Sequence, residues 1–268
     1  MEIGNRNFEI GKRTYIMGIL NVTPDSFSDG GKFRDISSAI NHAKKMVADG
    51  ADIIDIGGES TRPGHDPVSE EEEIKRVVPI IEALKKEISV PISVDTYKGR
   101  VAELAVKVGA AMINDVWGFK KDAYIASVAA KYNVPCCLMH NRDNKNYTNL
   151  VCDIINDLEE SIQIALKAGV KKENIILDPG IGFAKSYEDN LKTMNSLEKL
   201  NSLGYPVLLG TSRKSMIGFA LDLPASDRLE GTLATTTIGI MKGCEFIRVH
   251  DVLENKRVCV MTDAICRS

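Results

Sequence analysis

The 268-residue chain has few of the features that mark metal-folded, secreted or membrane proteins. Its six cysteines form no CxxC pair, and no histidines and cysteines have the spacing of a zinc site. The N-terminus lacks a basic start followed by a long apolar run, so no signal peptide is expected. No stretch approaches the roughly 20 apolar residues of a membrane-spanning helix. We therefore expect a cytoplasmic protein with buried free thiols, in which Cys136 and Cys137 point to opposite sides of one strand.

Excess charge and linker sequences are also scarce. The formal net charge of −3 provides no broad basic field for nucleic acid or an anionic membrane. No Pro-, Gly- or Ser-rich tract divides the chain, and no block of like charge is longer than Glu70–Glu73. Ser69 precedes this block and is expected to cap a helix, because acidic residues in a first turn are favoured by the helix dipole. We expect one domain over residues 1–268, with a core that needs no disulfide or metal.

A short apolar run, a polar loop and a helical pattern repeat eight times along the chain. The expected strands are Tyr15–Leu20, Asp52–Ile56, Ile92–Val94, Ala111–Asn114, Val134–Met139, Ile175–Leu177, Val207–Leu209 and Phe246–Val249. The expected helices lie near residues 36–49, 69–88, 98–108, 122–131, 150–168, 187–202, 226–242 and 251–266. This alternation predicts a parallel sheet, and eight units in a chain of this length favour a closed (β/α)8 TIM barrel over an open sheet. Glycines 4 and 11 bracket Asn5–Ile10 and predict a small hairpin that closes the N-terminal end of the barrel.

Three polar residues directly follow apolar strand runs: Asp95, Asn114 and Asp178. In a (β/α)8 barrel such positions meet at the C-terminal face, where active sites of this fold lie. Carboxylates there must be solvated, paired or bound to a ligand, because burying a lone charge is very costly. Carboxylates accept two adjacent N–H groups, and an amide offers one donor and one acceptor. The set therefore suits a flat heterocycle with an amino-pyrimidinone edge, although any one aspartate alone would more often be a helix cap; the lack of matching histidines argues against catalytic zinc.

The loops after the first two expected strands carry groups that suit an anion and a cation. Asn21 stands at the end of the first strand, where its amide oxygen can reach a hard cation. Phe27 lies in the polar loop that follows and needs a partner there; an exposed turn is the alternative interpretation. Thr61 and Arg62 suit phosphate, since guanidinium forms paired charge-assisted hydrogen bonds. A structural turn in which arginine pairs with Glu59 is the alternative for the second loop.

The later strand ends add basic groups. No GxxxxGK[ST] phosphate loop frames Lys214. Arg213 and Lys214 could instead neutralise an anion or bind a ring carbonyl; a solvated surface group is the alternative for Arg213, whereas Lys214 is expected in the site. Arg248 and His250 should point the same way from the eighth strand and suit a flat ring or an oxyanion. Met139 can pack on a ring, but core filling is an equal alternative.

These motifs, taken in order, resemble the dihydropteroate synthase family of pterin-binding enzymes over Met17 to Asp251. The matching segments are Gly18–Gly31, Asp55–Gly64, Val94–Lys98, Ile113–Val116, Asp178–Phe183, Gly210–Ser215 and Arg248–Asp251. The resemblance implies a barrel enzyme that joins 6-hydroxymethyl-7,8-dihydropterin diphosphate to 4-aminobenzoate and releases diphosphate. It also implies inhibition by sulfonamides, Mg²⁺ as the cofactor and a homodimer.

The resemblance also implies roles for individual residues. The family's ring-binding positions correspond to Asp95, Asn114, Asp178 and Lys214, with Arg248, Met139 and Phe183 packed around the ring. Its diphosphate-binding positions correspond to Asn21, Thr61, Arg62, Arg248 and His250, and Asn21 would also contact Mg²⁺. The surroundings of the aminobenzoate correspond to Phe27, Pro63, Ser212 and Lys214. The expected catalytic residues are Asp95, Lys214 and Asn21, acting in a dissociative displacement.

Two segments depart from the family pattern. Ala184 stands where glycine is common, and the fifth loop, Asn141–Tyr147, lacks a Gly-Thr-Pro pattern. Both departures concern the rim of the ring pocket rather than the residues assigned to chemistry. Two alternatives share the ring-binding set: a pterin-dependent methyltransferase that acts on methyltetrahydrofolate and a corrinoid protein, and a non-catalytic pterin-binding protein.

Overall fold

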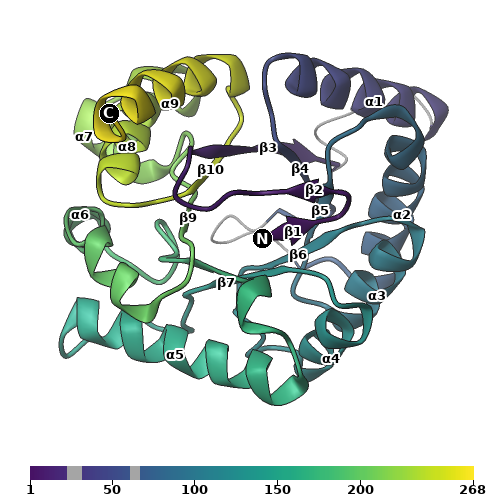
Figure 1. Ribbon diagram of the computed structural model, residues 1–268, viewed down its shortest axis with the longest axis horizontal. Helices are drawn as coiled ribbons and strands as arrows, with labels where there is room; N and C mark the ends of the chain where they lie inside the picture. The colour runs from purple at the N-terminus through teal and green to yellow at the C-terminus, as the bar shows by residue number, and fades with distance from the viewer. Residues whose placement is uncertain (23–31, 61–66) are drawn as a thin grey trace.

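The computed structural model describes residues 1–22, 32–60 and 67–268 and shows a closed barrel of parallel strands surrounded by helices (Figure 1). The barrel strands are β3 (Tyr15–Asn21), β4 (Ile53–Gly57), β5 (Ile92–Asp95), β6 (Met112–Asp115), β7 (Cys136–Met139), β8 (Ile175–Asp178), β9 (Leu208–Leu209) and β10 (Phe246–Val249). They are hydrogen-bonded in the order β8-β7-β6-β5-β4-β3-β10-β9, and a parallel bridge between Leu177 and Val207 closes the ring. The prediction of a (β/α)8 barrel is confirmed.

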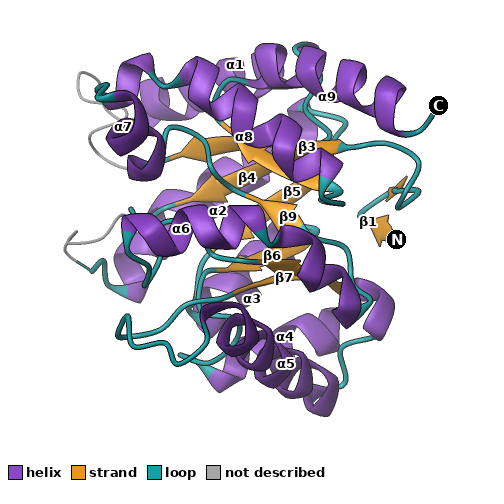
Figure 2. Cartoon of the chain, turned by 90° about the vertical axis from the view of Figure 1, so that its left-hand side faces the viewer, coloured by secondary structure: helices purple, strands orange, loops and turns teal. Residues whose placement is uncertain are grey.

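The helices follow the strands and cover the outside of the barrel (Figure 2). They are α1 (Lys32–Ala48), α2 (Glu70–Glu87), α3 (Gly99–Val108), α4 (Ala123–Tyr132), α5 (Leu150–Ala168), α6 (Tyr187–Asn195), α7 (Ser215–Leu221), α8 (Leu229–Met241) and α9 (Val252–Cys266). The helix expected near 187–202 ends at Asn195 and continues as a 3-10 segment, Leu197–Leu203. The seven-residue α7 was not predicted, because it is too short to show a helical repeat. None of the helices described is long and apolar enough to cross a membrane.

The predicted N-terminal hairpin is present and plugs the bottom of the barrel (Figure 1). Its strands are β1 (Glu2–Ile3) and β2 (Arg6–Asn7). The turn that joins them contains Gly4, which has a φ of 60°, so the turn lies at Gly4 and not at the middle of the segment between Gly4 and Gly11. Ile3 and Phe8 are buried, and the Phe8 ring centroid lies 4.8 Å from that of Tyr15 at the base of β3. Apolar contact therefore fixes the hairpin in place.

Two smaller predictions have mixed outcomes. The Ser69 side chain accepts the Glu72 N–H at 3.3 Å, so the predicted helix cap is confirmed. Cys136 packs between the barrel and its helices and Cys137 packs in the barrel interior, as their opposite orientation requires. The prediction of buried thiols is wrong for Cys152 and Cys266, which are exposed because they lie on the solvent side of α5 and at the end of α9.

The barrel interior changes from apolar at its base to polar at its mouth. Its base is filled by Ile3, Phe8, Tyr15, Met17, Ile53, Met112, Cys137, Ile176, Leu208 and Phe246. Further along the strands the register places Asp95 between Gly57 and Asn114, and Gly57 beside Asn21. The ends of neighbouring strands thus bring their polar residues to one face of the molecule, as predicted.

Candidate active site

The centre of the barrel mouth is a half-buried arginine, Arg248, held by two buried carboxylates. The Arg248 Nε donates to Asp55 Oδ2 at 2.6 Å, and its Nη2 donates to Asp95 Oδ2 at 2.6 Å. The Asn114 Nδ2 donates to the same Asp55 oxygen at 3.0 Å. Among the described residues, the buried Oδ1 of Asp95 has no hydrogen-bond partner. A buried carboxylate oxygen without a partner can accept a hydrogen bond from an N–H group of a ligand.

Asp178 and Lys214 lie on the opposite side of this mouth. Asp178 Oδ1 accepts the Gly180 N–H at 2.7 Å, which leaves Oδ2 to a ligand. The Lys214 ammonium donates to the carbonyl of Ile181 and lies 4.8 Å from the Phe183 ring centroid. A Cβ added to Gly210 would come within 3.9 Å of both Asp178 Oδ2 and Lys214 Nζ and within 3.8 Å of Arg248 Cβ. The missing side chain at position 210 therefore leaves room between the acidic and basic groups.

Burial shifts the ionisation of these groups toward neutral pH. Desolvation raises the pKa of Asp95 to about 7, against the opposing charge of Arg248. Desolvation also raises the pKa of Asp178, although Lys214 opposes the shift. Desolvation lowers the pKa of Lys214 to about 8, although Asp178 opposes that shift. Perturbed carboxylates and a perturbed lysine facing one opening are typical of a site that binds and transforms a ligand.

These shifts predict a bell-shaped pH profile. In the ring-binding roles predicted for them, Asp95 would have to be ionised to accept N–H groups and Lys214 would have to be protonated to donate. We expect kcat/KM for the ring substrate to rise with pH to a limb near the Asp95 pKa of about 7 and to fall beyond a limb near the Lys214 pKa of about 8. Initial rates at low substrate concentration would measure both limbs. A flat profile from about pH 5.5 to 9.5 would contradict these assignments.

A second group of polar side chains lies beside β10. Ser212 Oγ lies 2.9 Å from His250 Nδ1 and accepts the His250 backbone N–H at 3.2 Å. Asn21 ends β3 and is half-buried, and a Cβ added to Gly57 would lie 3.9 Å from its Oδ1. Arg213 neither faces the mouth alone nor stands free in solvent: it forms a two-bond ion pair with Asp251.

The remaining predicted site residues divide into described and undescribed ones. Met139 is buried at the end of β7, in register with Asp178, so it faces the same mouth. Phe183 is half-buried beside Lys214. Four predicted site residues of the first two loops lie outside the described residues: Phe27, Thr61, Arg62 and Pro63.

The structure adds residues that were not assigned from the sequence. One of them is Asp55, which accepts a hydrogen bond from Asn114. The sequence feature that could have indicated its role is an acidic residue inside the otherwise apolar strand Ile53–Gly57. Lys98 donates to Glu59 and to the carbonyl of Val68, which flank the second loop on its two sides. Lys98 also donates to the buried Glu73 at 2.6 Å, so it joins Glu59 and Val68 to α2.

The two departures from the family pattern contact one another. The Tyr147 hydroxyl of the fifth loop donates to the carbonyl of Ala184 at 2.8 Å. Ala184 has a φ of 47°, a left-handed conformation in which glycine is less strained. The next residue, Lys185, is buried and lies 2.8 Å from His140 Nδ1, and desolvation lowers its pKa to about 7. The rim beside Phe183 is therefore held by the fifth loop.

Comparison with known proteins is consistent with this geometry. The sequence profile of the family described as "Pterin binding enzyme" matches residues 17–250. The dihydropteroate synthase of Clostridium beijerinckii is 68% identical over 268 residues, which cover 100% of both chains. The crystal structure of a Clostridium difficile dihydropteroate synthase, determined in the presence of pteroic acid, is 56% identical with a TM-score of 0.96 and covers 98% of this chain and 100% of its own. A Yersinia pestis dihydropteroate synthase in complex with a sulfonamide drug is 39% identical with a TM-score of 0.93, covering 100% of this chain and 99% of its own.

Proposed function

The chain belongs to the dihydropteroate synthase family of pterin-binding enzymes, and from this premise we infer that its barrel mouth joins 6-hydroxymethyl-7,8-dihydropterin diphosphate to 4-aminobenzoate. The products are 7,8-dihydropteroate and diphosphate, so a C–N bond forms and a C–O bond breaks. The observation that carries this conclusion is the convergence of Asp95, Asn114, Asp178 and Lys214 around the half-buried Arg248. Four strand ends supply acceptors and donors for one flat polar ring.

The ring pocket supports a dissociative displacement. As the bond between the pterin methylene and the diphosphate oxygen breaks, positive charge spreads over the ring. Asp95 and Asp178 are buried carboxylates at the mouth, and fixed negative charge stabilises a cation strongly where water is excluded. The nitrogen of aminobenzoate is a competent nucleophile toward a carbocation, so the reaction needs no strong general base.

We propose that the diphosphate lies on the side of the mouth formed by Asn21 and His250. Thr61 and Arg62 would contribute from the second loop, and Arg248 from the pocket centre. Mg²⁺ usually keeps several waters and takes few protein ligands when substrate phosphates supply oxygen. Asn21 fits this role because its amide oxygen stands beside a glycine, Gly57, which leaves space for an ion. In the described part of the chain no three His, Cys, Asp or Glu side chains gather to hold a metal. In the proposed arrangement the diphosphate would supply further oxygen ligands.

Removing Mg²⁺ should separate turnover from ring binding. With excess EDTA we expect dihydropteroate formation to fall to background and to return when Mg²⁺ is restored, because the ion stabilises the departing diphosphate. Pteroic acid carries no diphosphate, so its dissociation constant, measured by calorimetry, should stay unchanged in EDTA. Undiminished turnover in EDTA would refute the role of Mg²⁺.

The second substrate is proposed to enter beside Ser212 and Lys214, with Phe27 and Pro63 completing its surroundings. Sulfonamides are structurally similar to 4-aminobenzoate, and the related Yersinia pestis enzyme has been crystallised with one. We propose that sulfonamides compete with aminobenzoate for this part of the site.

The experiment that tests the proposed function is a direct assay for product. The purified chain is incubated with the dihydropterin diphosphate, Mg²⁺ and labelled aminobenzoate, and labelled dihydropteroate is separated by chromatography. The expected result is product formation that a sulfonamide inhibits competitively with aminobenzoate. Binding of pteroic acid without turnover would favour the non-catalytic alternative, and methyl transfer from methyltetrahydrofolate to a corrinoid would favour the methyltransferase.

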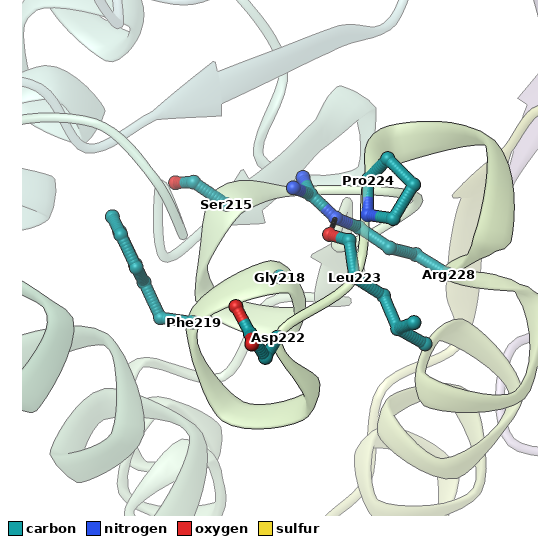
Figure 3. Close-up of a pocket in the computed structure, with 7 residues that line it drawn as sticks. All are labelled: Ser215, Gly218, Phe219, Asp222, Leu223, Pro224 and Arg228. Carbon is teal, nitrogen blue, oxygen red and sulfur yellow. Dashed lines mark hydrogen bonds between the residues drawn. The ribbon is translucent and has the colours of Figure 1, made fainter.

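We also propose that the enzyme is a homodimer that associates through α7, α8 and α9. Large apolar side chains on these helices are exposed, including Phe219 at 70%, Met241 at 67% and Ile265 at 64%. Phe219 and Leu223 also line a surface pocket beside α7 (Figure 3). Apolar surface of this kind on a soluble protein commonly marks a protein interface.

Introducing charge on this surface should break the dimer. We expect wild type to sediment as a dimer and the double variant Phe219→Glu, Met241→Glu to sediment as a monomer, because burying two carboxylates at an apolar interface is unfavourable. Sedimentation velocity measures both species, with Lys145→Glu, on the exposed fifth loop, as the control. A monomeric wild type at micromolar concentration would contradict the proposed assembly.

A further inference from the structure

Asp55 lies beneath the ring pocket and joins two of the groups that form it. We propose that Asp55 is a positioning residue: it fixes the amide orientation of Asn114 and the plane of the Arg248 guanidinium. This inference rests on the proposed function of the site. It assigns a role to an acid that stands inside a strand, below the residues expected to touch the ring.

The Asp55 side chain is fully buried and accepts two hydrogen bonds on one oxygen. Asp55 is 0% exposed and lies on β4, in register with Ile19 and Ser93. Its Oδ2 accepts from Arg248 Nε at 2.6 Å and from Asn114 Nδ2 at 3.0 Å. One carboxylate oxygen thus connects strands β4, β6 and β10 at the floor of the pocket.

The first consequence concerns Asn114. An asparagine amide can present either its oxygen or its nitrogen in a given direction, but a carboxylate only accepts hydrogen bonds. Asp55 therefore holds the Nδ2 end of Asn114 toward itself, and Oδ1 remains to accept from a ligand. The ring edge at this position must then present an N–H group. Without the Asp55 carboxylate, both orientations of the Asn114 amide would be populated. In one of them the Asn114 Nδ2 would face the N–H group of the ligand, and no hydrogen bond could form.

The second consequence concerns Arg248. Its Nε edge is held by Asp55 and its Nη2 by Asp95, so two carboxylates fix the plane of the guanidinium. A guanidinium fixed in this way presents a flat face on which a ring can pack. Loss of Asp55 would leave Arg248 with Asp95 alone, so the guanidinium plane would no longer be fixed at both ends. This weakens the pocket although Asp55 does not itself reach the ring.

A second aspartate on the same segment provides a matched control. Asp52 precedes β4 at the base of the barrel, where it accepts from Arg13 at 2.6 and 3.0 Å and from the Ile16 backbone N–H at 2.9 Å. Asp52→Asn removes the same kind of carboxylate–arginine pair far from the mouth. We expect it to lower thermal stability and to leave the kinetic constants unchanged.

The test compares Asp55→Asn, Asp52→Asn and the exchange variant Asp55→Asn, Asn114→Asp. Leaving a buried charged partner unsatisfied corresponds to a change of about 10- to 100-fold. We expect Asp55→Asn to lower kcat/KM for the dihydropterin diphosphate and to raise the dissociation constant of pteroic acid by amounts in that range. The KM for aminobenzoate should change less than about twofold, because that substrate binds away from Asn114. The exchange variant should recover most of the loss, since the amide and the carboxylate exchange places and keep the bond between them.

Each outcome separates this inference from the proposed function. If Asp55→Asn only lowers stability, as Asp52→Asn does, Asp55 is structural and the inference is overturned. If wild type makes no dihydropteroate but Asp55→Asn still weakens pteroic acid binding, the proposed function fails and the positioning role stands. If Asp55→Asn does not fold, the exchange variant decides: binding of pteroic acid within about tenfold of wild type supports the inference, and loss of binding in a folded protein overturns it.

Discussion

Replacing Asp95 by asparagine should lower kcat by about two to three orders of magnitude while the protein stays folded. Asparagine has the shape of aspartate but no charge, so the variant removes a fixed negative group from the place where the pterin cation forms. The carboxylate also accepts from Arg248 Nη2 at 2.6 Å, and an amide nitrogen turned toward that donor would repel it. Steady-state kinetics give kcat, and thermal unfolding confirms the fold.

The control for this prediction is again Asp52→Asn, which removes an arginine-paired carboxylate from the base of the barrel. It should unfold at a lower temperature than wild type but turn over at the wild-type rate. Wild-type kcat in folded Asp95→Asn would show that Asp95 does not stabilise the transition state. Such a result would remove the electrostatic basis of the proposed mechanism.

Removing the ammonium of Lys214 should be comparably damaging. Lys214→Ala is expected to lower kcat/KM for the dihydropterin diphosphate by about 100-fold or more, because the ring loses a charged donor. Asp178 would lose a nearby positive charge as well, and Lys214 is one of the groups that hold the Asp178 pKa down against burial. More of Asp178 would then be protonated near neutral pH and unable to accept from the ring.

A longer uncharged side chain separates charge from packing at this position. Lys214→Met keeps the aliphatic stem that lies against Gly182, where an added Cβ would come within 3.1 Å of the lysine Cδ. It should lose as much activity as the alanine variant if the ammonium is responsible. Lys242→Ala, which removes a surface ion pair with Glu198, should retain full activity. Full activity in Lys214→Met would assign the loss in Lys214→Ala to packing alone.

The sequence was sufficient to predict which polar side chains meet at the barrel mouth, because position along a strand determines position in a barrel. Asp95, Asn114 and Asp178 each follow an apolar run, and the strand register places Asp95 directly beside Asn114. Lys214 was predicted to lie at the mouth because it follows the seventh expected strand, and its Nζ and Asp178 Oδ2 both lie within 3.9 Å of a Cβ added to Gly210. These predictions needed only the local sequence and the rule that strand ends of a (β/α)8 barrel converge on its C-terminal face.

The sequence was not sufficient where a contact depends on how the barrel closes. Asp55 and Arg248 are 193 residues apart in the chain, and they meet because β10 pairs with β3 and β3 with β4. The run Asp52–Ile56 was interpreted as a strand, and Asp55 within it was not assigned a partner. The pair between Arg213 and Asp251 was not predicted for the same reason, since Asp251 follows the next strand. Charge pairing across strands has no local signature in one sequence.

The measurement that tests the ring pocket most directly is a crystal structure of the chain with pteroic acid bound. We expect the pterin ring at the barrel mouth, with N–H groups donated to Asp95, Asn114 and Asp178, the Lys214 ammonium at the ring carbonyl, and the ring plane against Arg248. Asn114 should keep its Nδ2 on Asp55. A ring bound away from these residues, or one that makes no hydrogen bond to either Asp95 or Asp178, would contradict the account.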